Sequence, residues 1–236
     1  MTSLPPYTVR VSTRARHVNL KISPDGELEV VIPRGFNRQH IPGILQKKQA
    51  WIKRTAKRVA ERREHRAAQP VLPTEILFLA VGESWAVEYK PTASNGITIT
   101  EKPAQRLVLS GAVADVDLCR VALRKWTARK GKQVLEPWLR AVSSEENLPF
   151  DNVTIRGQKT RWGSCSSRET ISLNYKLLFL PPEFVRYVLI HELCHTKELN
   201  HSAKFWALVA EKEPNYKQIK KELRAAWRYL PGWVPK

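Results

Sequence analysis

Residues 191–201 read His-Glu-Leu-Cys-His-Thr-Lys-Glu-Leu-Asn-His, and they are the starting point for interpreting the rest of the chain. His191 and His195 are four positions apart, so their imidazoles leave the same face of a helix about one turn apart. Two ring nitrogens placed in this way can reach one metal ion, and zinc is commonly bound by such a pair. The carboxylate of Glu192 projects beside them, where it can accept a proton from water held by the metal. The spacing therefore predicts a zinc site on a helix.

The residues before the motif predict that this helix is buried. Pro181 and Pro182 are tolerated in the first turn of a helix but not inside one. Residues 183–190, Glu-Phe-Val-Arg-Tyr-Val-Leu-Ile, are apolar on nearly every side of a helix, which is typical of a buried helix. Histidine and glutamate side chains inside such a helix need polar partners, and a metal ion supplies them.

A third ligand has to come from outside this helix, because a catalytic zinc keeps one coordination position open for water or substrate. His201 is one candidate, since Asn200 can end the first helix and Asn200 or Ser202 can cap the next. A carboxylate on the following helix, Glu211 or Glu213, is the alternative. We favour His201.

The chain is strongly basic. It has 40 Lys and Arg against 22 Asp and Glu, a formal net charge of +18 and an isoelectric point near 10.1. The excess lies in residues 1–70 and 151–236, whereas residues 71–150 are nearly balanced. Such a charge can attract nucleic acid, nucleotides or other anions, or can serve solubility alone.

The cysteine count, the single methionine and the hydropathy of the chain argue against several classes of protein. The three cysteines are too few for a disulfide framework and indicate a reducing compartment. The only methionine is Met1, which excludes a metzincin, because that class needs a methionine turn below the metal. No apolar run approaches the length of a membrane span. We therefore expect a cytoplasmic protein with no membrane partner.

The first region, residues 1–112, is expected to be a small antiparallel β unit with one basic helix. A helical pattern rich in lysine and arginine runs over residues 40–66. This helix could bind an anionic partner such as nucleic acid, or it could be a solvated face. Alternating apolar and polar residues predict short strands at 7–12, 17–22, 28–32, 76–81, 85–89, 97–100 and 107–110.

The second region, residues 113–236, is expected to be a mainly helical catalytic half, so the fold class is α+β. Helical patterns are found at 115–146, 203–209 and 219–229.

A short β-hairpin, with strands at 153–156 and 170–174, is predicted just before the metal helix. Its edge strand can pair with an extended peptide through backbone groups. The polar turn between the strands holds Arg161 and Trp162, which could bind substrate or seat the hairpin on the helix.

Several motifs together resemble the YgjP-like family of bacterial metal-dependent hydrolases, which is related to the SprT and Spartan-type zinc peptidases. The motifs are Arg161-Trp-Gly-Ser-Cys-Ser166, Ile171-Ser-Leu-Asn174, His191-Glu-Leu-Cys-His195, Asn200-His201-Ser202 and Phe205-Trp206. The N-terminal strands, with their Pro-Asp-Gly turn and the run Ile32-Pro-Arg-Gly35, extend the resemblance over most of the chain. It implies a zincin-like catalytic half with His191, His195 and His201 as zinc ligands and Glu192 as the catalytic carboxylate.

The expected chemistry is metal-assisted hydrolysis of a peptide, with Glu192 as general base. Arg161 and Tyr187 are candidates for stabilising the developing oxyanion. Two other classes stay open, because fold and metal do not fix the substrate. One is a hydrolase of nucleotide phosphoanhydride bonds, which is suggested by the positive charge and the arginines near the site, and the other is a DNA-associated zinc protein.

Overall fold

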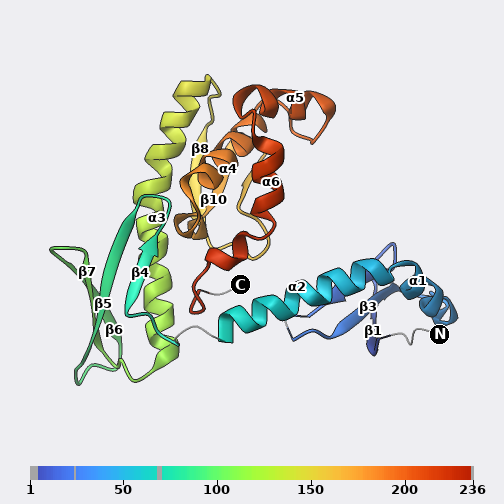
Figure 1. The fold of residues 1–236 in the computed structure, drawn as a ribbon, viewed down its shortest axis with the longest axis horizontal. Coiled ribbons are helices and arrows are strands. Elements are labelled where there is room, and N and C mark those ends of the chain that lie inside the picture. Colours follow the sequence, from blue (N-terminus) through green and yellow to red (C-terminus); the bar gives the residue numbers. More distant parts are fainter. Residues whose placement is uncertain (1–4, 24, 68–70, 235–236) are drawn as a thin grey trace. The chain divides into compact units, whose positions relative to one another are not determined.

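The computed structural model describes residues 5–23, 25–67 and 71–234, which divide between two compact units, Met1–Gln69 and Pro70–Lys236 (Figure 1). Each unit has a hydrophobic core of its own, and the two cores share no residue. None of the helices in these stretches combines the length and the apolar character that a membrane span requires.

The first unit is built on a three-stranded sheet with the strand order β1-β3-β2. The central strand β3 pairs in parallel with β1 and antiparallel with β2, so that Val30 lies opposite both Val9 and Leu20. These three paired residues place apolar side chains on one face of the sheet, as a half-buried sheet requires. The strands are β1 (Tyr7–Ser12), β2 (Asn19–Ile22) and β3 (Leu28–Pro33).

Helices complete the core of the first unit. Ile41 and Leu45 of α1 and Ile52 of α2 pack with the apolar residues of β3, and all three are buried. The lysine and arginine side chains of α2 at positions 53, 54, 57 and 58 are exposed. The elements are the 3₁₀ helix η1 (Arg38–His40), α1 (Ile41–Lys47) and α2 (Gln49–Ala67).

The second unit begins with a four-stranded sheet packed against the long helix α3 (Val116–Glu146). Trp126 of α3 stacks on Phe78 and meets Trp85 edge-on, with ring centroids 5.6 and 5.3 Å apart. The strand order is β4-β5-β7-β6, in which β5 and β7 are parallel and the other pairs antiparallel. The strands are β4 (Glu75–Phe78), β5 (Glu83–Pro91), β6 (Ile97–Lys102) and β7 (Arg106–Gly111).

A second sheet in this unit, with the order β8-β10-β9, lies next to helix α4 (Pro182–Cys194). The central strand β10 is parallel to β8 and antiparallel to β9. The hairpin predicted from strands 153–156 and 170–174 is therefore wrong, because these two strands are parallel and the antiparallel partner of β10 lies in the segment predicted to be a turn. The strands are β8 (Asn152–Arg156), β9 (Gly163–Cys165) and β10 (Thr170–Asn174), and the 3₁₀ helix η2 (Tyr175–Phe179) follows them.

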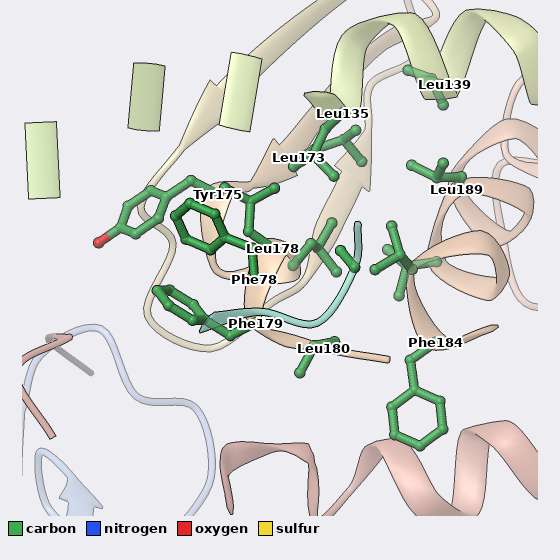
Figure 2. Close-up of a cluster of buried hydrophobic side chains, with 14 of the residues drawn as sticks. Phe78, Leu135, Leu139, Leu173, Tyr175, Leu178, Phe179, Leu180, Phe184 and Leu189 are labelled. Atoms are coloured by element: carbon green, nitrogen blue, oxygen red, sulfur yellow. The ribbon is translucent and has the colours of Figure 1, made fainter. Parts of the chain in front are cut away.

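The core between these elements is dense and apolar (Figure 2). Side chains from β4, α3, β10, η2 and α4 (Pro182–Cys194) meet there, including Phe78, Leu135, Leu173, Phe179 and Leu189. The chain then continues through α5 (Ala203–Lys212), α6 (Tyr216–Leu223) and the 3₁₀ helix η3 (Ala226–Tyr229).

The mixed α+β class agrees with the sequence prediction, but the strands associate differently from the expected antiparallel unit. The strands of residues 1–112 form two separate sheets, and each contains a parallel pair, β1 with β3 and β5 with β7. Local alternation predicts that a segment is a strand, but it carries no information about which distant strand it pairs with. The boundary expected after residue 112 also differs from the division after Gln69, because the sheet of β4–β7 packs on α3.

Candidate metal centre

Helix α4 carries the first two histidines, and its sequence explains why it is buried. Pro182 occupies the first turn, and the helix continues to Cys194, with His195 as its C-cap. Its buried side chains point in every direction around the axis: Phe184, Val185, Tyr187, Val188, Leu189, Ile190, Glu192, Leu193 and Cys194. The apolar pattern of residues 183–190 therefore predicted both the helix and its burial correctly.

The imidazoles of His191, His195 and His201 come together at one point. Their candidate ligand atoms all lie within 4.8 Å of one another, and Nε2 of His201 is 3.1 Å from Nε2 of His191. Two nitrogens bound at about 2.0–2.1 Å to one tetrahedral zinc would lie about 3.3 Å apart, close to this separation. Three imidazole nitrogens are also a donor set that suits zinc. The residues present therefore fit a bound zinc ion.

His201 reaches this point because the chain turns sharply after α4. Ser202 ends the turn as the N-cap of α5, and its hydroxyl accepts a hydrogen bond from the backbone N–H of Phe205 at 3.2 Å. An N-cap of this kind fixes where the next helix begins. The cap that the sequence predicted at Ser202 is present, and it holds His201 beside α4.

A backbone carbonyl that the sequence did not single out orients His195. Nδ1 of His195 lies 3.0 Å from the carbonyl oxygen of Glu198, so this nitrogen donates a hydrogen bond and Nε2 remains free to bind a metal. Nδ1 of His191, by contrast, is buried without a hydrogen-bond partner in the part of the chain that the structure covers.

The surroundings favour neutral imidazoles, the form that binds metals. Burial, helped by the nearby His195, His201 and Lys220, lowers the pKa of His191 to about 3. Burial also lowers the pKa of His195, although its hydrogen bond to the Glu198 carbonyl opposes this shift.

Two aromatic residues of α5 pack against the histidines. The ring of Phe205 is stacked on His195 with centroids 4.4 Å apart, and Trp206 is stacked on His201 with centroids 5.4 Å apart. These two aromatics therefore pack around the histidines themselves. They hold the imidazole planes in fixed orientations.

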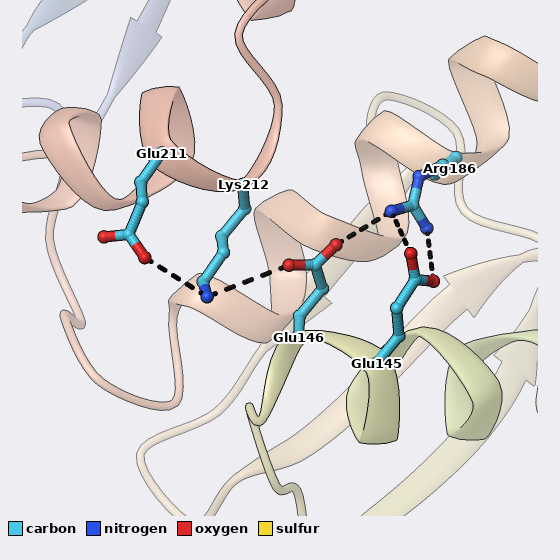
Figure 3. Close-up of polar contacts among 5 residues, drawn as sticks. All are labelled: Glu145, Glu146, Arg186, Glu211 and Lys212. Carbon is cyan, nitrogen blue, oxygen red and sulfur yellow. Dashed lines mark hydrogen bonds and ion pairs between the residues drawn. The ribbon is translucent and has the colours of Figure 1, made fainter.

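The two carboxylates considered as alternative ligands have other partners. Glu211 forms an ion pair with Lys212 at 3.2 Å, in a network with Glu146 of α3 (Figure 3). A carboxylate oxygen of Glu213 accepts a hydrogen bond from the backbone N–H of Asn215 at 3.2 Å. Neither belongs to the group of potential ligands formed by the three histidines.

Glu192 is buried and is held by strand β9. A Cβ atom built on Gly163 would lie 2.7 Å from both Cγ and Oε1 of Glu192, so only glycine leaves room for this carboxylate. The backbone N–H of Cys165 donates a hydrogen bond to it. Burial raises the pKa of Glu192 to about 8, against the opposing effects of Arg161 and the Cys165 N–H. The sequence did not identify Gly163 or Cys165 as neighbours of Glu192.

The loop before β9 places Arg161 and Trp162 near the site. The side-chain amide of Asn174 donates to the carbonyl of Arg161 at 2.8 Å, and its backbone N–H donates to the carbonyl of Trp162 at 2.8 Å. Arg161 is exposed and acts electrostatically on Glu192, whereas Trp162 is partly buried and packs against the core. Tyr187 lies with its ring centroid 5.9 Å from that of His191. Asn174 is thus a positioning residue that the sequence did not reveal.

Comparisons with known proteins identify the family of this chain. The sequence profile of the YgjP-like metallopeptidase domain matches residues 16–226. Among solved structures, the metallopeptidase zymogen abylysin of Pyrococcus abyssi is 29% identical with a TM-score of 0.36, and the match covers 39% of this chain and 93% of that chain. The metallopeptidase zymogen jannalysin of Methanocaldococcus jannaschii is 21% identical with a TM-score of 0.35, covering 39% and 94% respectively. No curated protein matches the chain.

Proposed function

Because the chain belongs to the family of YgjP-like metallopeptidases, we propose that it is a zinc-dependent peptide hydrolase with Glu192 as general base. The observation that carries this proposal is the convergence of His191, His195 and His201 beside a buried carboxylate. Zinc bound there would polarise a water molecule and the substrate carbonyl, which makes hydrolysis feasible at neutral pH.

The protein's own groups supply the proton transfers. Glu192 accepts a proton from the attacking water and returns it to the leaving amine, as a general base and then a general acid. Burial raises the pKa of this carboxyl to about 8, and a zinc ion bound beside it would oppose the shift and favour the ionised form that accepts a proton. The N–H of Cys165 and the backbone at Gly163 fix the direction in which the carboxylate points.

Strand β9 is our candidate for holding the peptide. It lies at one edge of its sheet and contacts α4, so an extended peptide added to it would run past Glu192. Arg161 is exposed in the loop just before β9, and it is the candidate for stabilising negative charge on the substrate. The three cysteines are free thiols, which supports our placement of the protein in the reducing cytoplasm.

The decisive variant is Glu192→Gln, which keeps the size of the side chain but cannot accept a proton. We expect it to retain zinc and to lose about 10²–10⁴ in turnover of an unstructured protein such as casein. Zinc content by mass spectrometry, melting temperature and cleavage should be measured together. Normal turnover per bound zinc would remove Glu192 from the mechanism, and hydrolysis of nucleoside triphosphates without peptide cleavage would favour the phosphoanhydride alternative.

The proposed third ligand is tested by comparing His201→Ala with Glu211→Ala. The histidine variant should lower zinc affinity at least about 10-fold, because a zinc-nitrogen bond is lost, and the glutamate variant should leave it unchanged. Competition with a zinc-binding dye measures both affinities. The opposite order would assign the third position to the carboxylate.

A further inference from the structure

Beside the histidines, α5 and α6 form an open groove with a volume of about 410 Å³. The groove has a basic lining, since four of its six residues are cationic and none is acidic. The lining residues are Trp206, Tyr216, Lys217, Lys220, Lys221 and Arg224. Its volume is in the range of sites that bind small molecules or segments of a peptide.

The four cations are available to a ligand. No ion pair between any of them and an acidic residue is found in the described part of the chain. Instead, Nζ of Lys220 lies 3.6 Å from the centre of the Trp206 ring, and Nζ of Lys217 lies 5.9 Å from that of Tyr216. The side chains of Lys217, Lys221 and Arg224 are exposed, so a ligand in the groove can reach them. An anionic group that enters the groove would find several unpaired donors.

The groove adjoins the candidate metal centre through Trp206, which contacts both. Trp206 lines the groove and is also stacked on His201, with centroids 5.4 Å apart and planes at 16°. Lys220 is close enough to His191 to contribute to the lowered pKa of that histidine. A ligand in the groove would therefore lie next to a substrate held at the histidines.

The aromatic residues make a nucleobase a poor occupant. The ring of Trp206 is stacked on His201 and on Tyr216 and is also covered by Lys220, so its faces are already occupied. Single-stranded nucleic acid needs free aromatic faces on which bases can stack. Carboxylates need only the cations, which remain accessible.

We propose that this groove binds an acidic segment of the peptide substrate and thereby selects substrates with aspartate or glutamate near the cleaved bond. The proposal deepens the proposed function and rests on it for the cleavage step. The binding step can be measured without cleavage, so the failure of one proposal can be told from the failure of the other.

The test is binding of a fluorescein-labelled peptide with four consecutive glutamates to the full zinc-loaded chain carrying Glu192→Gln. The groove variant replaces Lys217, Lys221 and Arg224 by glutamine, and we expect its affinity to fall about 10-fold, because several exposed charge contacts are lost together. The matched control replaces Lys102, Lys125 and Lys132, exposed cations elsewhere in the same unit, and should bind as before. Melting temperatures show whether both variants fold.

A matched peptide with glutamine in place of glutamate completes the test. It should bind the unaltered groove at least about 10-fold more weakly than the acidic peptide, and the difference should shrink as salt is raised. Equal weakening by the groove and control variants would show a general effect of net charge and overturn the proposal. Tighter binding of a nucleoside triphosphate, lost in the groove variant alone, would also overturn it and assign the groove to nucleotides.

Discussion

At the scale of single residues, the candidate site depends on a contact between Gly163 and Glu192. Any side chain at Gly163 would meet Cγ, Cδ and Oε1 of Glu192 at distances of 2.7 to 2.9 Å. These atoms are the end of a flexible side chain, so Glu192 would move aside and strand β9 would keep its place. The glycine therefore fixes the position of the carboxylate relative to the histidines.

Gly163→Ala should separate the positioning of the Glu192 carboxylate from the binding of zinc. We expect zinc content to remain normal and turnover of a peptide substrate to fall about 100-fold, because displacement of a catalytic group by about 1 Å has costs of that order. Zinc analysis and steady-state cleavage measure the two effects.

The control is Gly96→Ala, since a Cβ there would meet only Oγ of Ser94 at 4.0 Å. That variant should keep its full turnover. If Gly163→Ala is as active as the control, the carboxylate does not need this position.

At the scale of elements, ion pairs link α4 to α3 and link α3 to α5 (Figure 3). Arg186 of α4 donates to both carboxylate oxygens of Glu145, at 3.0 and 2.9 Å, and to Glu146 at 2.8 Å. Glu146 also pairs with Lys212 of α5 at 3.8 Å. The side chain of Glu146 is only 12% exposed, so this part of the network is shielded from solvent. It fixes α4, and with it the histidines, against its neighbours.

Arg186→Ala should destabilise the second unit by about 1–3 kcal/mol, because it leaves Glu146 without its closest cation in a partly buried position. For a unit of this size, each kcal/mol corresponds to roughly 2–4 °C in melting temperature. Calorimetry of the zinc-loaded chain measures the shift.

Arg140→Ala is the matched control, because Arg140 pairs with Glu136 at 2.9 Å within the exposed face of α3. Such a pair contributes about 0.3–0.5 kcal/mol, so the control should melt within a few degrees of the unaltered chain. Equal effects of the two variants would mean that the network around Glu146 adds nothing beyond an ordinary surface pair.

At the scale of the whole molecule, the basic helix α2 and the candidate metal centre belong to different units. The exposed cations Lys53, Arg54, Lys57 and Arg58 lie on α2 of the first unit, whereas the three histidines lie in the second. The cores of the units share no residue, so a change of charge on α2 should leave the metal centre intact.

Replacing these four cations by glutamate should weaken binding to a polyanion such as heparin or single-stranded DNA and should leave zinc content unchanged. The slope of log affinity against log salt should become shallower by about one for each cation that contacts phosphate. Affinity titrations at several salt concentrations give this slope. If the unaltered chain does not bind polyanions, or the variant binds equally well, the face is solvated surface.

Local patterns in the sequence were sufficient for most of the elements and for the grouping of candidate ligands, although strand β9 was predicted to be part of a turn. The i, i+4 spacing of His191 and His195 and the apolar run before them determine a buried helix with two imidazoles on one face, because both are properties of a single helix. The turn residues around Asn200 and Ser202 determine where the next helix begins, and so they place His201.

Other features were decided only by the tertiary structure, because they join residues whose relation has no local period. The parallel pairing of β1 with β3, the contact of Gly163 with Glu192 and the stacking of Trp206 on His201 are of this kind. Strand pairing and side-chain packing between elements depend on the global arrangement, which alternation and helical periodicity do not encode. The sequence by itself thus determined two candidate ligands and the helix that carries them, and it favoured His201 as the third, whereas packing determined how the carboxylate is aimed and where the basic groove lies.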